Sequence, residues 1–284
     1  MRNICATQTQ IHDLVDSFWI FLSRNGYTAH LESFKRRLKD DEKAAEAEAV
    51  VFSFLWSAKR HPDIFEIPGK GGPDFCCCLS PEKKFLVEVT SLDSVSVSDK
   101  SGLPEKVSGS GGSAYALITS KLQGVAKRKA PQLSEHPYPR VLAITLKYDF
   151  AGLLMDRRAA SELLIGKTWF HVPIGRLDSP TYTSVDPSNA VFYDTYMCDP
   201  SGGSVRPRLQ SISAILLVSI YPNQSEVVGI LHPEPSVPFD PKLFPQIPFL
   251  RFKHWPPIDG RPETEWIFGE DSQDYAVFQH KRIV

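Results

Sequence analysis

The segment at residues 141–146 constrains the fold most, because every side chain in it except that of Thr145 is apolar. A strand that is apolar on both faces is typical of the interior of a sheet that helices cover on both sides. A helical pattern of apolar residues at 114–133 precedes it along the chain. The sequence therefore predicts an α/β protein in which residues 141–146 form a strand buried on both faces.

The segments before this strand alternate between helical and extended patterns. Helices with apolar residues at helical spacing are expected at residues 9–24, 28–39 and 42–60. Short apolar runs bounded by turn residues are expected to form strands at residues 64–67, 74–79 and 85–90. From residue 42 onward the order is helix, three strands, helix and strand, which indicates a mixed α/β core.

Two punctuating features interrupt this order. The Ser- and Gly-rich stretch at residues 94–113 is expected to be a flexible loop. Pro131 is expected to kink or end the helix at 114–133, because proline lacks the N–H that a helix interior requires.

The second half of the chain carries weaker patterns. A helix is expected at residues 155–165, and strands are expected at 212–221 and 226–231. Residues 232–262 are dense in proline and aromatic residues, which excludes regular helix there. We therefore divide the chain into a helical N-terminal extension, a core, and a strand- and loop-rich C-terminal extension packed on that core, at residues 1–40, 41–150 and 151–284.

The charge balance limits how the protein can bind nucleic acid. The 32 basic and 33 acidic residues give a formal net charge of −1, whereas proteins that coat nucleic acid non-specifically are usually strongly basic. Any contact with nucleic acid must therefore come from a local basic patch. No apolar run reaches roughly 18 residues and the N-terminus lacks the apolar core of a signal peptide, so no membrane partner is expected.

The five cysteines predict neither disulfides nor a zinc site. Cys76, Cys77 and Cys78 are consecutive, whereas Cys5 and Cys198 are isolated. An odd count with three in a row is a poor disulfide framework, and the paired spacing of zinc ligands is absent. We interpret the three consecutive residues as small side chains of a core strand in a reducing, cytoplasmic environment.

Two acidic residues occupy matching positions of the hairpin expected from residues 74–79 and 85–90. If these strands pair antiparallel about Pro81, Asp74 and Glu88 lie directly opposite each other. Directly opposed residues project to one face with their Cβ atoms about 4.5–5.5 Å apart. Two like charges placed in this way repel each other, and folding alone offers no reason for the arrangement. A divalent cation between them converts the repulsion into binding.

The residue types around the two acids favour a hard cation. Carboxylate oxygens, with the carbonyl of Val89 as a further ligand, indicate Mg²⁺ or Mn²⁺ rather than zinc. Period-two alternation places Glu88 and Thr90 on one face of their strand and Val87 on the other. The simpler interpretation takes Asp74 as a turn residue and Glu88 as an isolated strand acid, but burying a glutamate unpaired is costly.

The hairpin and its flanking elements resemble a known nuclease family. Gly-Gly-Pro-Asp74-Phe, followed by Val-Glu88-Val-Thr90, is similar to the PD and (D/E)XK elements of the PD-(D/E)XK nuclease superfamily. The resemblance covers residues 42–147. It implies a restriction-endonuclease-like mixed sheet flanked by helices, with helical N-terminal and strand-rich C-terminal extensions. It also implies metal-dependent hydrolysis of phosphodiester bonds, in DNA rather than RNA, with Asp74 and Glu88 as metal ligands.

The resemblance assigns further residues. An acidic residue on the helix before the sheet often joins the metal ligands in that family, and Glu48 and Glu46 are the candidates here, with Glu48 bordering the apolar stripe. The motif usually ends in a lysine that positions or activates the attacking water, whereas this chain has Thr90, which can only form hydrogen bonds. Three alternatives follow: Lys70 or Lys121 substitutes for the lysine, the metal activates water alone, or the site has lost activity.

The helix expected at residues 114–133 carries a cluster of polar and basic residues. Related nucleases often place lysine and glutamine on this helix beside the active site. Lys121 and Gln132 correspond to them here, and Lys127, Arg128 and Lys129 form a basic cluster on the same helix. These side chains are candidates for binding the phosphates of a nucleic acid, although a solvated helix face is the simpler interpretation.

Other enzyme classes lack their motifs in this chain. Neither a Gly-x-Ser-x-Gly elbow nor a Walker-type phosphate loop occurs in the sequence. The main alternative is a catalytically inactive protein of the same fold that binds nucleic acid or a protein partner. Residues 232–262, with Trp255, offer a partner surface unless they pack across the core. A homodimer is a further expectation for a nuclease that must cut two strands with one metal site per chain.

Overall fold

The centre of the protein is one mixed sheet, seen in a computed structural model. The structure describes residues 8–67, 71–80, 83–103, 117–134, 136–171, 182–196, 204–221, 224–257 and 262–267. In spatial order the eight strands are β1 (Pro62–Ile64), β2 (Phe75–Ser80), β3 (Lys83–Ser91), β4 (Arg140–Lys147), β9 (Ala214–Tyr221), β10 (Gln224–Leu231), β11 (Phe249–Phe252) and β12 (Thr264–Ile267).

The strands of this sheet run in both directions. Pairing is antiparallel from β1 through β2 to β3, and parallel from β3 through β4 to β9. β9 and β10 are antiparallel, β10 and β11 are parallel, and β11 and β12 are antiparallel. Because β9 pairs directly with β4, the boundary that we place at residue 150 falls within one continuous sheet.

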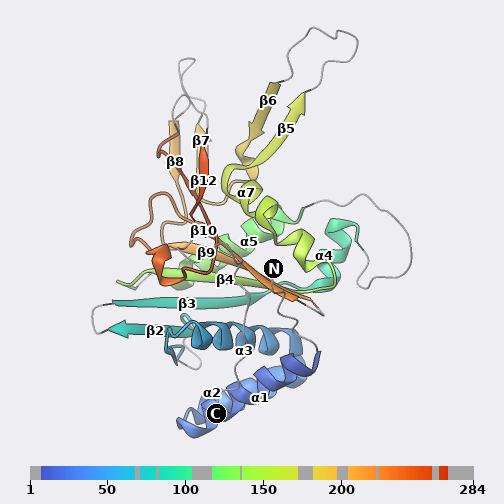
Figure 1. Ribbon diagram of the computed structural model, residues 1–284, viewed down its shortest axis with the longest axis vertical. Coiled ribbons are helices and arrows are strands. Elements are labelled where there is room, and N and C mark those ends of the chain that lie inside the picture. The colour runs from blue at the N-terminus through green and yellow to red at the C-terminus, as the bar shows by residue number, and fades with distance from the viewer. Residues whose placement is uncertain are drawn as a thin grey trace.

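Three N-terminal helices form the layer on one face of the sheet. They are α1 (Gln8–Arg24), α2 (Thr28–Asp40) and α3 (Glu42–Ser57), and they lie together below the sheet in Figure 1. Their apolar residues pack against alternate strand residues, as Phe52 does against the ring of Phe75. This layer contains the first of two hydrophobic cores.

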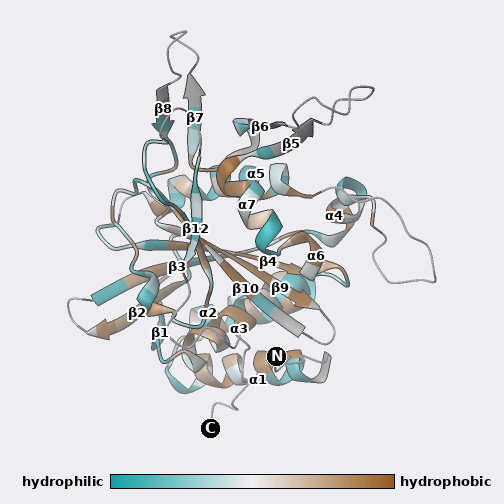
Figure 2. Cartoon of the chain, turned by 45° about the horizontal axis from the view of Figure 1, so that its top comes forward, coloured by the Kyte–Doolittle hydropathy of each residue, from teal (hydrophilic) through white to brown (hydrophobic). Residues whose placement is uncertain are grey.

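Later helices cover the opposite face. They are α4 (Ser94–Ser101), α5 (Thr119–Lys129), α6 (Ala151–Leu154) and α7 (Arg157–Ile165). Leu142 and Ile144 of β4 belong to this second core, whereas Val141 and Ala143 belong to the first. The expectation for residues 141–146 is therefore confirmed: β4 is buried on both faces. Hydrophobic residues gather along β4, β9 and β10 at the centre of the molecule (Figure 2).

Smaller elements lie beside the main sheet. β5 (Lys167–His171) pairs with β6 (Tyr182–Asp186), and β7 (Tyr193–Tyr196) pairs with β8 (Ser204–Pro207), both antiparallel. Both pairs project away from the main sheet on the side of α7 (Figure 1). The described 3₁₀ turns are η1 (Ala130–Leu133), η2 (Pro187–Asn189) and η3 (Pro241–Leu243).

Several elements of the first half match their expected positions. The three N-terminal helices are present, with α3 ending at Ser57 rather than at residue 60. β2 and β3 form the expected hairpin. α5 begins at Thr119, later than residue 114, and Pro131 does end it as an α-helix, because the chain continues there as the 3₁₀ turn η1.

Two expectations in this half are wrong. The strand expected at residues 64–67 is β1 instead, because its ladder with β2 ends where Ile64 pairs with Phe75. The stretch 94–113 is not loop throughout, because α4 forms at its start. Asp93 caps this helix by accepting the N–H of Ser96, and Gly102 ends it in the left-handed conformation at φ +77°. Residues 104–113 lie outside the described residues.

The second half follows its expected pattern and adds to it. The helix expected at 155–165 is α7. Asp156 caps its N-terminus, where the side chain accepts the N–H groups of Arg158 and Ala159. The strands expected at 212–221 and 226–231 are β9 and β10. β11 and β12 were not expected, because each is only four residues long.

The Pro- and aromatic-rich segment packs across the sheet. No regular α-helix occurs in its described part, residues 232–257 and 262, as expected. Phe239 and Phe244 are buried in the first core, and Trp255 packs against the second, where its Nε1 donates to Glu234. This segment therefore contributes to the cores, which is the second of the two interpretations that the sequence left open.

Two further expectations concern the cysteines and membrane-spanning helices. Cys76, Cys77 and Cys78 of β2 are free thiols, and Cys77 is fully buried, whereas Cys78 is partly exposed. Within the described ranges, no helix combines the length and the hydropathy that crossing a membrane requires.

The approach of β10 to β11 requires glycine at one position. A Cβ on Gly229 would lie 2.2 Å from Cδ1 and 2.3 Å from Cε1 of Phe249, whose ring is buried. We expect Gly229→Ala to lower the free energy of unfolding by about 1–3 kcal/mol through overpacking. Gly124→Ala in α5, where nothing lies within 4 Å, is expected to raise it by about 0.5–1 kcal/mol. Urea unfolding measures both, and equal effects would contradict this packing.

Candidate functional site

The candidate site lies where the hairpin of β2 and β3 opens. The ladder pairs Phe75 with Val87 and Cys76 with Leu86, which confirms the register expected from the sequence. Asp74 stands one residue before β2, and its Oδ2 accepts the N–H of Val89 at 2.6 Å. The Asp74 carboxylate therefore accepts a backbone N–H of β3 in place of a strand partner, just beyond the first residue of β2.

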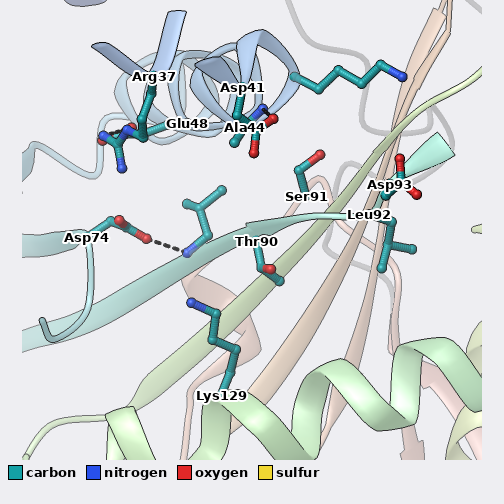
Figure 3. A pocket seen from close by; sticks show the side chains of 12 residues that line it. Arg37, Asp41, Ala44, Glu48, Asp74, Thr90, Ser91, Leu92, Asp93 and Lys129 are labelled. Atoms are coloured by element: carbon teal, nitrogen blue, oxygen red, sulfur yellow. Dashed lines mark hydrogen bonds and ion pairs between the residues drawn. The ribbon is translucent and has the colours of Figure 1, made fainter. Parts of the chain in front are cut away.

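A pocket of about 360 Å³ opens beside Asp74 and the end of β3. Figure 3 shows α2 and α3 on one side of it, the end of β3 in the middle and Lys129 of α5 on the other side. The lining residues are Arg37, Asp41, Lys43, Ala44, Glu48, Asp74, Val89, Thr90, Ser91, Leu92, Asp93 and Lys129. Charged side chains of α2, α3 and α5 thus meet those of Asp41, Asp74 and Asp93, which lie just outside the helices and strands, in one small volume.

Asp74 is held in an environment that disfavours its negative charge. Burial is the largest effect that raises the pKa of Asp74 well above its usual value, and the carboxylates of Glu88 and Glu48 raise it further. The hydrogen bond from Val89 acts in the opposite direction. A carboxylate in this position is stabilised by binding either a proton or a cation.

Glu88 lies on β3 and is 3% exposed. Its Oε1 accepts a hydrogen bond from Nζ of Lys129 at 2.6 Å. Its Oε2 is buried and has no hydrogen-bond partner among the described residues. Burial raises the pKa of Glu88 and Lys129 lowers it, with burial the larger effect. An unsatisfied buried oxygen costs about 1–3 kcal/mol, which a bound cation would offset.

Glu48 reaches the pocket from α3. It is 7% exposed and forms an ion pair with NH2 of Arg37 on α2. Burial raises the pKa of Glu48 to about 7, against the opposing effect of Arg37 and with further increases from Glu66 and Glu88. The charges of Glu48 and Glu88 both raise the pKa of Asp74, so three carboxylates interact at this site.

The second candidate on the same helix lies elsewhere. Both carboxylate oxygens of Glu46 accept hydrogen bonds from Nζ of Lys147, at 2.7 and 2.6 Å, and Glu46 does not line the pocket. Residues two positions apart on an α-helix point about 200° apart. Of the two glutamates considered from the sequence, the structure therefore brings Glu48 to Asp74 and directs Glu46 away.

The lysine beside the acids is neither of the two considered as substitutes. Lys121 donates to Oγ of Ser96 at 2.6 Å and does not line the pocket, and Lys70 lies outside the described residues. Lys129 enters the pocket instead, from a position about 12 Å further along the axis of α5 than Lys121. Thr90 lines the pocket, in the position where the resemblance expects lysine.

The other members of the basic cluster stay on the surface. Lys127, Arg128 and Gln132 are exposed on α5 and η1 and do not line the pocket. Their position near Lys129 in the chain agrees with a solvated helix face, and equally with a surface that contacts phosphates.

Two residues of the site were missed by sequence reasoning. Arg37 lies in a basic run that resembles an ordinary solvated helix face, and no local pattern indicates its contact with Glu48. Glu66, which follows β1, raises the pKa values of Glu48, Asp74 and Glu88. The pattern at residues 64–67 indicates only a strand, and the folded chain alone places Glu66 near the other carboxylates.

Glu48, Asp74 and Glu88 do not have the arrangement of a preformed metal-binding site. Within the described ranges, no group of three His, Cys, Asp or Glu side chains has the arrangement of a metal site. Arg37, the N–H of Val89 and Lys129 each engage one carboxylate. The donor set nevertheless fits a hard divalent cation, because all candidate ligands are oxygens and Oε2 of Glu88 is buried without a donor. Cation binding would require the carboxylates to exchange partners.

Comparisons with known proteins identify no relative. No protein-family model, curated protein or solved structure matches this chain.

Proposed function

We propose that the protein is a metal-dependent nuclease that hydrolyses phosphodiester bonds in DNA. The observation that carries the proposal is the meeting of Glu48, Asp74 and Lys129 at one pocket, with Glu88 beside it. Glu88 forms an ion pair with Lys129, and its charge raises the pKa of Asp74. Repulsion among buried carboxylates disfavours folding, so such a cluster is expected where a cation is bound in function. The lysine beside it offers positive charge to a phosphate.

The order of elements around the pocket supports a relationship to PD-(D/E)XK nucleases. α3 supplies Glu48, the β2–β3 hairpin supplies Asp74 and Glu88, and α5 and β4 follow. A restriction-endonuclease-like fold is the arrangement that the resemblance implies for this order. We assign the role of the missing motif lysine to Lys129, because its ammonium group contacts Glu88 although residue 90 is threonine.

Each residue has a proposed role in hydrolysis. Glu48, Asp74 and Glu88 would hold Mg²⁺ or Mn²⁺, with the carbonyl of Val89 nearby, because its N–H already points toward Asp74. When bound, the cation supplies a Lewis acid for a phosphate oxygen and lowers the pKa of a coordinated water. Lys129 would neutralise charge that develops on the phosphate. The N–H of Val89 fixes the orientation of Asp74.

A second candidate function keeps the fold without the chemistry. The partners already bound to the three carboxylates, and the absence of a finished metal arrangement among the described residues, favour a protein that binds nucleic acid or a protein partner without cleaving it. The two functions differ in one measurable property, which is metal-dependent cleavage.

The test compares cleavage by purified protein with Mg²⁺, Mn²⁺ or EDTA, on supercoiled DNA, linear DNA and RNA. We expect cleavage of DNA that requires the metal ion. Glu48→Gln is expected to slow it about 100-fold or more, equivalent to about 2.7 kcal/mol. Glu46→Gln is the matched control, because it alters a buried, ion-paired glutamate of the same helix outside the pocket. It is expected to leave the rate within about threefold of the wild type.

Two results would count against the proposal. Wild-type protein that cleaves neither DNA nor RNA with either metal would favour the binding function. Equal loss of activity in Glu48→Gln and Glu46→Gln would indicate that the effect comes from the stability of α3 rather than from the pocket.

A further inference from the structure

We propose that Arg37 binds a phosphate group of the substrate. In the metal-free protein Arg37 is paired with Glu48, and it becomes available to the phosphate when a divalent cation binds the Glu48 carboxylate. This inference rests on the proposed function, because it assumes that Glu48 binds the cation and that the substrate is a nucleic acid. It assigns a specific role to α2, which lies outside the elements that the nuclease resemblance covers.

Arg37 lies at the pocket and is only partly exposed. Its side chain is 31% exposed, and its NH2 group contacts Glu48, whose side chain is 9% exposed. Figure 3 shows Arg37 descending from α2 beside Glu48, on the side of the pocket opposite Lys129. A phosphate in the pocket would therefore lie between a guanidinium and an ammonium group.

The guanidinium of Arg37 has unused donor capacity. Its Nε is buried and has no hydrogen-bond partner within the described part of the chain. The fork of donors on arginine matches two oxygens of a phosphate, with two parallel hydrogen bonds. In the pair with Glu48, NH2 of Arg37 is the donor and Nε takes no part. A phosphate would satisfy the fork more completely than this carboxylate does.

The pairing of charges at the site couples the cation to the substrate. Arg37 neutralises Glu48, and Lys129 neutralises Glu88. If a divalent cation takes both carboxylates, the two basic side chains are left without their counter-charges at the pocket. A phosphate group restores the balance. The cation and the substrate should therefore each increase the affinity of the other, and thermodynamic linkage requires the two increases to be equal.

The test measures binding rather than cleavage. A fluorescently labelled DNA duplex is titrated with protein in Ca²⁺ and in EDTA, and anisotropy reports the affinity. Arg37→Met is expected to weaken binding in Ca²⁺ about tenfold, equivalent to about 1.4 kcal/mol. It should also reduce the slope of log affinity against log salt by roughly 0.9. Arg36→Met, which removes an exposed charge one residue away, should change the affinity less than about twofold.

A second pair of variants keeps the test valid if Arg37→Met unfolds the protein by leaving Glu48 buried without its partner. Glu48→Gln releases Arg37, so it is expected to tighten DNA binding in EDTA. Adding Arg37→Met to Glu48→Gln removes both members of the ion pair and should abolish this gain. A gain that persists in the double variant would overturn the proposal.

The inference and the proposed function fail in different measurements. Absence of metal-dependent cleavage contradicts the nuclease, whereas the role of Arg37 is judged from DNA affinity alone. The role of Arg37 would be overturned if folded Arg37→Met bound DNA in Ca²⁺ as tightly as the wild type does. It would also be overturned if the wild type did not bind DNA, even if cleavage were observed.

Discussion

Replacing Asp74 by asparagine is expected to abolish metal-dependent cleavage and to stabilise the metal-free protein at the same time. Asparagine keeps the shape of the side chain and an oxygen that can accept the N–H of Val89. It removes the negative charge that a cation needs and that Glu48 and Glu88 repel. We expect a loss of at least about a thousandfold in rate, or about 4 kcal/mol, and a gain on the order of 1–2 kcal/mol in stability at pH 8.

The stabilisation should depend on pH in a defined direction. The pKa of Asp74 is raised in the folded protein, so the folded state binds this proton more tightly than the unfolded state. Its contribution to stability is therefore present at pH values below about 4, the unfolded range for aspartate, and is lost as pH rises through the folded pKa. Glu48 behaves in the same way, since its pKa rises from 4.5 to about 7.

Thermal unfolding in EDTA across pH 4 to 9 measures this dependence. Asp74→Asn should be more stable than the wild type at high pH and should lose less stability as pH rises. Asp93→Asn is the matched control, because Asp93 also lines the pocket but its pKa is lowered, chiefly by the N–H of Ser96. It should not stabilise the protein. If Asp74→Asn were less stable than the wild type at pH 8, repulsion among the carboxylates would not destabilise this site.

Replacing Lys129 by methionine is expected to destabilise the protein and to slow cleavage. Glu88, which is 3% exposed, would lose its only cationic partner among the described residues. Breaking a buried ion pair by removing one partner typically costs about 3–5 kcal/mol, and the expected value here is near the lower end because Lys129 is 22% exposed. Loss of a charge next to the phosphate is expected to slow cleavage about 100- to 1000-fold.

A double variant separates these two effects. Lys129→Met combined with Glu88→Gln contains no unpaired buried charge, so it should recover most of the stability without recovering cleavage. Lys127→Met, on the exposed surface of the same helix, should change stability by less than about 0.5 kcal/mol. Urea unfolding at pH 8 and pH 5 gives a further check. Because the pKa of Glu88 is raised by burial, its carboxylate takes up a proton more readily as pH falls, which should reduce the cost of Lys129→Met. An equal cost at both pH values would falsify the assignment to this ion pair.

Local patterns were sufficient for the centre of the sheet and for the hairpin. The apolar run of β4 requires cover on both faces, and the structure provides a separate hydrophobic core on each side. The register of β2 and β3 follows from a short connection, since a connection of this kind leaves few alternative pairings. Asp74 and Glu88 are therefore close to each other for a reason that the sequence contains.

Composition was a poor guide where a few residues decide the structure. The Ser-rich segment after β3 reads as a loop, yet the cap provided by Asp93 and the buried side chain of Val97 are enough to form α4. β11 and β12 are too short to show a period-two pattern, and their position depends on pairing with β10 and with each other.

The sequence by itself determined the central strand, the hairpin and the pair of acids, because each depends on residues close together in the chain. Only the tertiary structure decided which basic side chains meet those acids. Lys129 and Glu88 are 41 positions apart, and Arg37 reaches Glu48 from a different helix. A charged residue on a helix looks the same in sequence whether it faces water or a pocket. The packing of α2 and α5 on opposite faces of the sheet makes that distinction, because it fixes which turn of each helix lies beside the end of β3.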